Sequence, residues 1–132
     1  MHEKIRVVIA DDHAIFRTGV RLLLEAEPDV EVVGEAANGD EAVELAQSLQ
    51  PDVVLMDIAM PGTNGLEATR SIKASCPDIH VLALTIHRSD EYFVEMLKAG
   101  ASGYVLKGAD TSEFLGAVRV VARGGEVFFT RR

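Results

Sequence analysis

The sequence predicts an α/β fold in which a parallel sheet is covered by helices on both faces. Five short apolar segments alternate along the chain with five segments whose apolar residues recur at helical spacing. Most of the apolar segments are continuous rather than alternating, which is typical of strands buried on both faces. Repeated strand–helix units join parallel strands through right-handed crossovers, so the pattern predicts a doubly wound sheet.

The five predicted strands are short segments rich in Val, Ile, Leu, Met and Ala. They cover residues 5–10, 30–36, 53–56, 81–84 and 103–106. Each is much shorter than the ~18–20 apolar residues that a membrane span requires. We therefore expect strands of a buried sheet and no association with a membrane.

Each predicted helix carries one apolar stripe, which we expect to lie against the sheet. In chain order, the stripes are Phe16, Val20, Leu23 and Leu24; Ala42, Leu45, Ala46 and Leu49; Leu66, Thr69 and Ile72; Phe93, Met96 and Leu97; and Phe114, Ala117, Val118 and Val121.

Residues that begin or end helices stand at the boundaries of these stripes. Asn38 and Asp110 each precede a glutamate by three positions, which is the pattern of a helix N-cap. Pro51 and Pro77 stand where the second and third helices should end, and Gly100 stands where the fourth should end. The helix boundaries are thus predicted independently of the apolar stripes.

Length, charge and cysteine content limit the classes of function. A chain of 132 residues fits one domain with its own core. With 13 Lys and Arg against 21 Asp and Glu, the net charge is −8, so a nucleic-acid backbone would repel it. The single Cys76 excludes an internal disulfide, and the N-terminus begins a buried strand without a signal peptide, so we expect a cytoplasmic location.

The strongest functional signal is a set of polar residues at the carboxyl ends of four predicted strands. Asp11 and Asp12 follow the first strand, Asp57 the third, Thr85 the fourth and Lys107 the fifth. In a doubly wound sheet this edge is where ligands bind. Clustered carboxylates repel one another unless a cation neutralises them, and Mg²⁺ accepts oxygen ligands while keeping waters for a phosphate. The sequence therefore predicts a site for Mg²⁺ (or Mn²⁺) at this edge.

The same residues suit phosphoryl transfer. A carboxylate can attack a phosphoryl group to form an acyl phosphate. The transition state spreads charge over the equatorial oxygens, so the protein mainly has to position and neutralise it. A divalent cation, the Lys107 ammonium and the Thr85 hydroxyl would each contact one oxygen.

Four segments resemble the receiver domains of two-component response regulators. They are ADDH at 10–13, LMDIAMPGTNGLE at 55–67, LALT at 82–85 and AGASGYVLKGA at 99–109. The segment FLGAVRVVARGGEVFFT, together with LKGAD, is similar to the NarL/FixJ (LuxR-type) branch. The resemblance covers essentially the whole chain. It implies a flavodoxin-like fold with five strands in the order 2-1-3-4-5 and five helices.

The resemblance implies a role for each residue of the acidic set. Asp57 is implied to be the phosphoacceptor. Asp12 would bind Mg²⁺ directly and Asp11 through a water molecule, while the backbone carbonyl of Ala59 would complete the protein ligands.

The resemblance also implies how phosphorylation acts. Lys107 would contact the phosphoryl group, Thr85 would move toward it, and Tyr104 would rotate inward behind it. Ala59 offers no side chain to an attacking water, and His87 is a candidate for tuning dephosphorylation. We therefore expect the protein to act as a signalling switch rather than as an enzyme that turns over a substrate.

Further expectations concern partners and domain boundaries. A cognate sensor histidine kinase would supply the phosphoryl group, and phosphorylation would promote a homodimer. Residues 1–123 would form the receiver and 124–132 the start of a linker to a C-terminal helix-turn-helix domain, absent here, that would bind DNA.

Several alternatives remain open from the residues alone. A stand-alone receiver of a phosphorelay or chemotaxis pathway, or a receiver that is never phosphorylated, would share most of the same motifs. A phosphatase of the haloacid-dehalogenase kind would need a second aspartate at the position of Ala59. A flavin or nucleotide module would need a glycine-rich turn after the first strand, where Asp11 and Asp12 stand instead.

Overall fold

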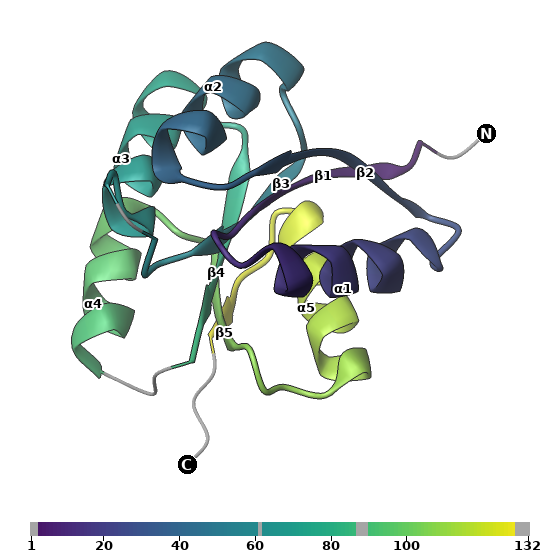
Figure 1. Ribbon diagram of the computed structural model, residues 1–132. Coiled ribbons are helices and arrows are strands. Elements are labelled where there is room, and N and C mark those ends of the chain that lie inside the picture. The colour runs from purple at the N-terminus through teal and green to yellow at the C-terminus, as the bar shows by residue number, and fades with distance from the viewer. Residues whose placement is uncertain (1–2, 61, 87–89, 129–132) are drawn as a thin grey trace.

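The computed structural model describes residues 3–60, 62–86 and 90–128, which form a parallel sheet covered by helices (Figure 1). The strand order is β2-β1-β3-β4-β5-β6, and every neighbouring pair is parallel. The strands are β1 (Ile5–Ala10), β2 (Val30–Ala36), β3 (Val53–Asp57), β4 (His80–Thr85), β5 (Gly103–Leu106) and β6 (Val127–Phe128). The predicted doubly wound fold and the order of its first five strands are confirmed.

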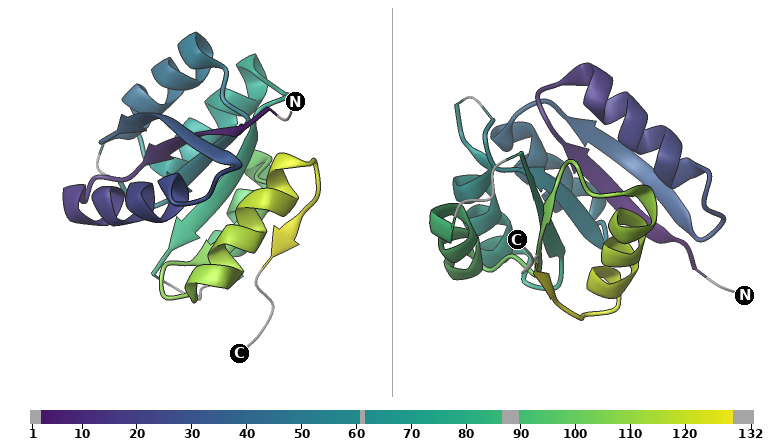
Figure 2. Two further views of the ribbon diagram at one scale, coloured as in Figure 1. Left: turned by 90° about the vertical axis from the view of Figure 1, so that its right-hand side faces the viewer. Right: turned by 90° about the horizontal axis from the view of Figure 1, so that it is seen from below.

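The helices form two layers, one on each side of the sheet (Figures 1 and 2). Helices α1 and α5 pack with one buried cluster of strand side chains, and α2 and α3 pack with another. A smaller cluster beneath α4 contains Met96 and Tyr104. The helices are α1 (Ala14–Glu25), α2 (Gly39–Leu49), α3 (Gly65–Ser75), α4 (Asp90–Ala99) and α5 (Thr111–Ala122).

The sheet has one short strand that the sequence did not predict. Strand β6 extends the edge beyond β5, and the amide of Val127 donates a hydrogen bond to the carbonyl of Ser102 at 3.0 Å. A strand of two residues is too short to produce a recognisable pattern. Part of the segment that we expected to begin a linker is therefore hydrogen-bonded to the sheet.

The helix caps follow the predicted chemistry. The side chain of Asn38 accepts a hydrogen bond from the amide of Glu41, and Asp110 does the same with the amide of Glu113. Helix α4 gives way to Gly100, whose φ of +103° lies in the left-handed region. Asn64 caps α3 in the same way, although the sequence analysis did not identify it.

Two of the residues expected on the buried stripes lie largely outside. Leu23 on α1 is 39% exposed and Leu97 on α4 is 42% exposed. Their neighbours Leu24 and Met96 are fully buried. Helices α1 and α4 therefore pack along a narrower strip than the sequence pattern suggested, and the residue at the margin of each stripe is partly exposed to solvent.

Helix α5 is tied to the turn that leads into β2. The Arg119 guanidinium lies 2.6 Å from Glu27 Oε1 and 2.9 Å from both carboxylate oxygens of Asp29. The hydrogen bond from Arg119 lowers the pKa of Asp29 to about 2. Because these groups are partly exposed, we assign the contact mainly to orienting α5 rather than to a large stabilisation.

Helix α3 approaches the main chain of β3 too closely for any side chain at its first residue. A Cβ atom on Gly65 would lie 2.2 Å from the carbonyl oxygen of Asp57 and 2.6 Å from Cα of Ile58. Both are backbone atoms that cannot move aside by rotating a side chain. Gly65 therefore fixes how closely α3 packs against the loop after Asp57.

We predict that Gly65→Ala lowers the free energy of unfolding by about 1–3 kcal/mol, because the new methyl group overpacks this contact. Urea unfolding would measure the change. Gly116→Ala is the matched control, since a Cβ there meets no atom within 4 Å and Gly116 lies inside α5. The control should raise stability by about 0.5–1 kcal/mol. Equal effects of the two substitutions would contradict the packing argument.

Candidate functional site

The register of the strands brings the predicted residues to one edge of the sheet. Ala10 pairs with Met56, so Asp11 and Asp57 each come next on neighbouring strands. Thr85 pairs with Leu106 on β5, and the amide of Lys107 donates a hydrogen bond to the Thr85 carbonyl at 2.8 Å. Four strand ends therefore meet where the strand order reverses around β1, as the sequence predicted.

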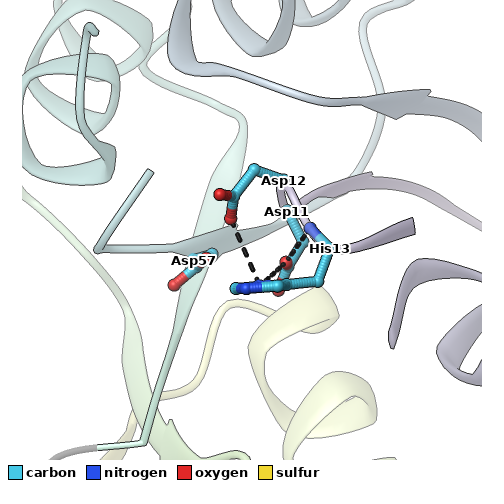
Figure 3. A group of neighbouring side chains, drawn as sticks. All are labelled: Asp11, Asp12, His13 and Asp57. Atoms are coloured by element: carbon cyan, nitrogen blue, oxygen red, sulfur yellow. Dashed lines mark hydrogen bonds and ion pairs between the residues drawn. The ribbon is translucent and has the colours of Figure 1, made fainter. Parts of the chain in front are cut away.

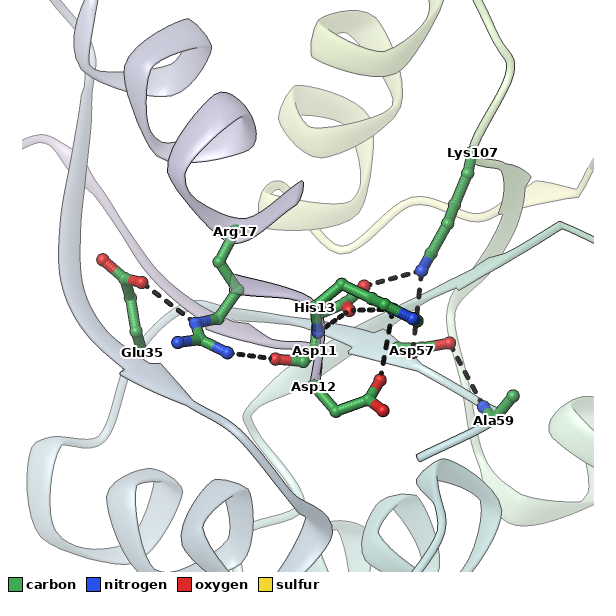
Figure 4. Close-up of polar contacts among 8 residues, drawn as sticks. All are labelled: Asp11, Asp12, His13, Arg17, Glu35, Asp57, Ala59 and Lys107. Carbon is green, nitrogen blue, oxygen red and sulfur yellow. Dashed lines mark hydrogen bonds and ion pairs between the residues drawn. The ribbon is translucent and has the colours of Figure 1, made fainter. Parts of the chain in front are cut away.

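The Lys107 ammonium group links the carboxylates of two strands (Figure 4). Its Nζ lies 2.7 Å from Asp11 Oδ2 and 3.6 Å from Asp57 Oδ2. The Asp11 contact is a close ion pair rather than a well-directed hydrogen bond. The ammonium also lies 4.4 Å from the centroid of the Phe16 ring, a cation–π distance. Lys107 is thus held among α1, β1 and β3, closer to Asp11 than to Asp57.

The Asp57 carboxyl group is almost completely buried. Only 3% of the residue is exposed, and its Oδ1 accepts a hydrogen bond from the amide of Ala59 at 3.1 Å. Burial raises the pKa of Asp57 above its ordinary value of 3.8, and the nearby charges of Asp11 and Asp12 raise it further. The Ala59 hydrogen bond and Lys107 oppose this rise in the pKa without cancelling it. Asp57 is therefore a carboxylate that the fold holds at an energetic cost when it is charged.

His13 completes the acidic cluster, although the sequence analysis did not assign it a role (Figure 3). Its Nδ1 lies 3.2 Å from Asp11 Oδ1 and 3.3 Å from Asp12 Oδ1. Its backbone amide also donates a hydrogen bond to Asp11 Oδ1 at 2.8 Å. The available signal was its position directly after two strand-end aspartates, because a chain that turns there folds its next side chain back over them.

The donor atoms suit a divalent cation. Asp11, Asp12, His13 and Asp57 each offer one ligand atom, and these atoms lie within 4.8 Å of one another. Oδ1 of Asp12 is buried and has no hydrogen-bond donor in the part of the chain that the structure describes. A buried carboxylate oxygen without a donor is costly unless a cation or water satisfies it. The three carboxylates therefore fit a hard ion such as Mg²⁺, and the identity of the ion stays a prediction.

Arg17 on α1 is hydrogen-bonded to the main chain at the end of β1 (Figure 4). Its Nη1 donates a hydrogen bond to the carbonyl oxygen of Asp11 at 2.6 Å, and its Nε donates to Glu35 Oε1 at 3.1 Å. The guanidinium therefore connects α1 to β1 and β2. It fixes the main chain from which Asp11 and Asp12 project.

The structure describes all of the remaining predicted residues except one. Thr85 is buried at the end of β4, and the side chain of Tyr104 is buried on β5. The Tyr104 ring contacts Phe93 of α4 edge to face, with centroids 5.6 Å apart and an interplanar angle of 82°. Ala59 is exposed just after β3. His87 lies outside the described residues.

A scan of the chain against protein families matches a model described as the response regulator receiver domain over residues 7–119. The curated relative DegU, a transcriptional regulatory protein of Brevibacillus brevis, is 51% identical over 122 residues. That match covers 92% of this chain and 52% of the relative. The chain thus spans about half the length of this relative.

Solved structures give the same result. A LuxR-family response regulator from Aurantimonas sp. SI85-9A1 superposes with a TM-score of 0.90 at 38% identity, covering 95% of this chain and 89% of that one. The receiver domain of the putative regulator NarL from Mycobacterium tuberculosis gives a TM-score of 0.89, also at 38% identity, covering 92% and 98%. No helix in the described part of the chain is long and apolar enough to cross a membrane.

The raised pKa of Asp57 leads to a stability prediction. In metal-free buffer, Asp57→Asn should raise the free energy of unfolding at pH 7 by about 0.5–3 kcal/mol. The substitution removes a buried negative charge that lies beside the negative charges of Asp11 and Asp12. The folded-state pKa is above the unfolded value of 3.8. The wild type therefore loses stability relative to the variant as pH rises from that value through the folded-state pKa.

The measurement is urea unfolding between pH 3.5 and 8, with EDTA present. The difference between variant and wild type should be small at the acid end and reach a plateau near neutrality. Asp78→Asn, an exposed aspartate in the turn before β4, is the control and should show no such growth. A difference that shrinks toward neutral pH would contradict the prediction.

Proposed function

This chain belongs to the response regulator receiver family, in its NarL/FixJ branch, and from that premise we propose that Asp57 accepts a phosphoryl group. The observation that carries the proposal is the position of Asp57 beside a lysine and a cation-binding set. Lys107 Nζ lies 3.6 Å from Asp57 Oδ2, and the carboxylates of Asp11 and Asp12 complete a cluster that fits a divalent ion. The same edge therefore supplies a nucleophile and two sources of positive charge.

In the proposed reaction, an Asp57 oxygen attacks the phosphorus atom of a phosphohistidine. The new O–P bond forms as the N–P bond of the donor breaks, and the imidazole leaves with the electron pair. Asp57 must be ionised to act as the nucleophile. The Ala59 amide holds Oδ1 of Asp57 during the attack.

The metal ligands in this proposal are Asp12, Asp57 and the backbone carbonyl of Ala59, with Asp11 acting through water. When bound, Mg²⁺ or Mn²⁺ would neutralise charge on the phosphoryl oxygens. Lys107 would exchange part of its pairing with Asp11 for a phosphoryl oxygen. Thr85 would donate its hydroxyl to another oxygen.

Phosphorylation would then change the surface beside β4 and α4. The added charge of about −2 draws Thr85 toward the active site, which alters the packing against Tyr104. Tyr104 already lies in the interior in this structure and contacts Phe93 of α4. In the proposed switch, phosphorylation therefore stabilises an inward ring and a matching position of α4 rather than creating them.

The phosphorylated state ends when water hydrolyses the acyl phosphate. Ala59 offers no side chain that could orient water, and we propose that His87 influences the rate instead. The protein is then a switch that is phosphorylated and dephosphorylated, without turnover of an external substrate.

The partners and context are also proposals. A sensor histidine kinase supplies the phosphoryl group, phosphorylation favours a homodimer, and the signalling takes place in the cytoplasm. The receiver, expected at residues 1–123, also includes the short strand β6, and we propose that a linker begins after this strand. The length of DegU supports a C-terminal DNA-binding domain in the complete protein, since this chain matches only 52% of it. A stand-alone receiver is the alternative.

The proposal predicts that acetyl phosphate with Mg²⁺ adds one phosphoryl group to the wild type, detected by mass spectrometry of the intact protein. Asp57→Asn should remain unlabelled, and EDTA should abolish labelling of the wild type. Asp78→Asn is the matched control and should label normally. Labelling of Asp57→Asn to the wild-type extent would overturn the assignment of the phosphoacceptor.

A second prediction concerns assembly. Beryllofluoride, which mimics the phosphoryl group, should increase the solution mass of the wild type from monomer toward dimer when Mg²⁺ is present. Light scattering after size-exclusion chromatography would measure it. Asp57→Asn should remain at one mass under both conditions, and an increase in that variant would show that assembly does not depend on the proposed site.

A further inference from the structure

We infer that His13 is a nitrogen ligand that makes the acidic cluster bind borderline transition ions such as Co²⁺, Ni²⁺ and Zn²⁺ more tightly than its carboxylates alone would. The inference rests on the proposed function only in taking this cluster as the site of a divalent cation. It concerns a residue that determines which ion binds, and this residue is not among the five strand-end residues predicted from the sequence.

The geometry places the imidazole among the oxygen ligands. Nδ1 of His13 lies 3.2 Å from Asp11 Oδ1 and 3.3 Å from Asp12 Oδ1 (Figure 3). Its ligand atom and those of the three aspartates lie within 4.8 Å of one another. One ion could therefore be shared by the imidazole and at least one carboxylate after small side-chain movements.

In the described part of the chain, no capping bond of the His13 side chain competes with this role. His13 is the N-cap residue of α1, but its side chain makes no capping hydrogen bond. The side chain is 68% exposed, and the contacts described for its ring are those with Asp11 and Asp12.

The cluster contains a carboxylate oxygen without a hydrogen-bond partner, and this oxygen lies beside the imidazole nitrogen of His13. Oδ1 of Asp12, which lies 3.3 Å from Nδ1 of His13, is buried and has no hydrogen-bond partner among the described residues. A cation between that oxygen and Nδ1 would satisfy both atoms. For this, Nδ1 must present its lone pair, which places the ring proton on Nε2.

The chemistry of the ligands then determines which ions benefit. Mg²⁺ favours oxygen ligands and gains little from an imidazole. Imidazole suits Co²⁺, Ni²⁺ and Zn²⁺, and affinity for these ions rises along the Irving–Williams order. His13 should therefore change the selectivity of the site while leaving its affinity for Mg²⁺ almost unchanged.

The competing explanation is that His13 only orients the carboxylates through hydrogen bonds. A glutamine at this position would keep a hydrogen-bond donor near Asp11 and Asp12 but would lack the imidazole ligand. If His13 acts only on the carboxylates, its replacement should affect all divalent ions alike. If it binds the ion, the replacement should affect only the transition ions.

The test is a titration of the wild type, His13→Gln and His80→Gln with Co²⁺, Ni²⁺ and Mg²⁺, followed by calorimetry and by the visible absorption of bound Co²⁺. Loss of an outer-shell partner typically weakens metal binding about 10- to 100-fold, so loss of a direct ligand should cost at least ~10-fold for Co²⁺ and Ni²⁺. The affinity for Mg²⁺ should change by less than ~3-fold. The Co²⁺ absorption band should also shift in His13→Gln.

His80→Gln is the matched control, because His80 begins β4 and so lies at the opposite edge of the sheet from the cluster. It should change neither the affinities nor the Co²⁺ spectrum. Asp12→Asn tests the location of the ion and should weaken binding of both Co²⁺ and Mg²⁺. Retention of wild-type Co²⁺ binding in Asp12→Asn would overturn the inference.

The remaining possible results also show whether the inference about His13 holds. Equal Co²⁺ affinity and spectrum in the wild type and His13→Gln overturn the inference, as does an equal loss for Co²⁺ and Mg²⁺. Beryllofluoride loading with Mg²⁺ on the same samples tests the proposed function separately. If the wild type loads beryllofluoride while His13→Gln binds Co²⁺ normally, only the inference about His13 fails. If the wild type does not load beryllofluoride, the proposed function fails.

Discussion

The ion pair between Lys107 and the buried carboxylates of Asp11 and Asp57 is the interaction on which the site depends. Without the ammonium, two almost completely buried aspartates would lie side by side with a third nearby, and each charge would raise the cost of the others. Lys107 offsets this repulsion only in part, because the pKa of Asp57 remains raised. A divalent cation bound among these carboxylates would reduce the remaining repulsion.

The fold holds these charges together through its main chain. Adjacent parallel strands deliver Asp11 and Asp57 to the same edge, and Arg17 fixes the carbonyl of Asp11. The close approach of Gly65 fixes the loop that supplies the Ala59 amide. Because each of these contacts involves the main chain on at least one side, the geometry of the site is determined by packing of whole elements. Like charges then remain adjacent, although their side chains would separate in a flexible loop.

The same framework connects the site to a surface. Thr85 is buried at the end of β4, and Tyr104 on the next strand contacts Phe93 of α4. In the proposed function, a change in charge at Asp57 would reach α4 through two neighbouring strands and one aromatic contact. The exposed residues Ile86, Val94 and Leu97 lie on or beside α4, where such a movement would alter an apolar surface.

The sequence by itself determined the class of fold, the order of its elements and five residues of the candidate site, because apolar periodicity and strand-end position are local properties of a chain. It did not determine that Lys107 pairs more closely with Asp11 than with Asp57, or that His13 turns back over the aspartates. It also placed Leu23 and Leu97 inside and missed β6. These features depend on distances between segments far apart in the chain and on how closely helices pack against the sheet, and only the tertiary structure sets those distances.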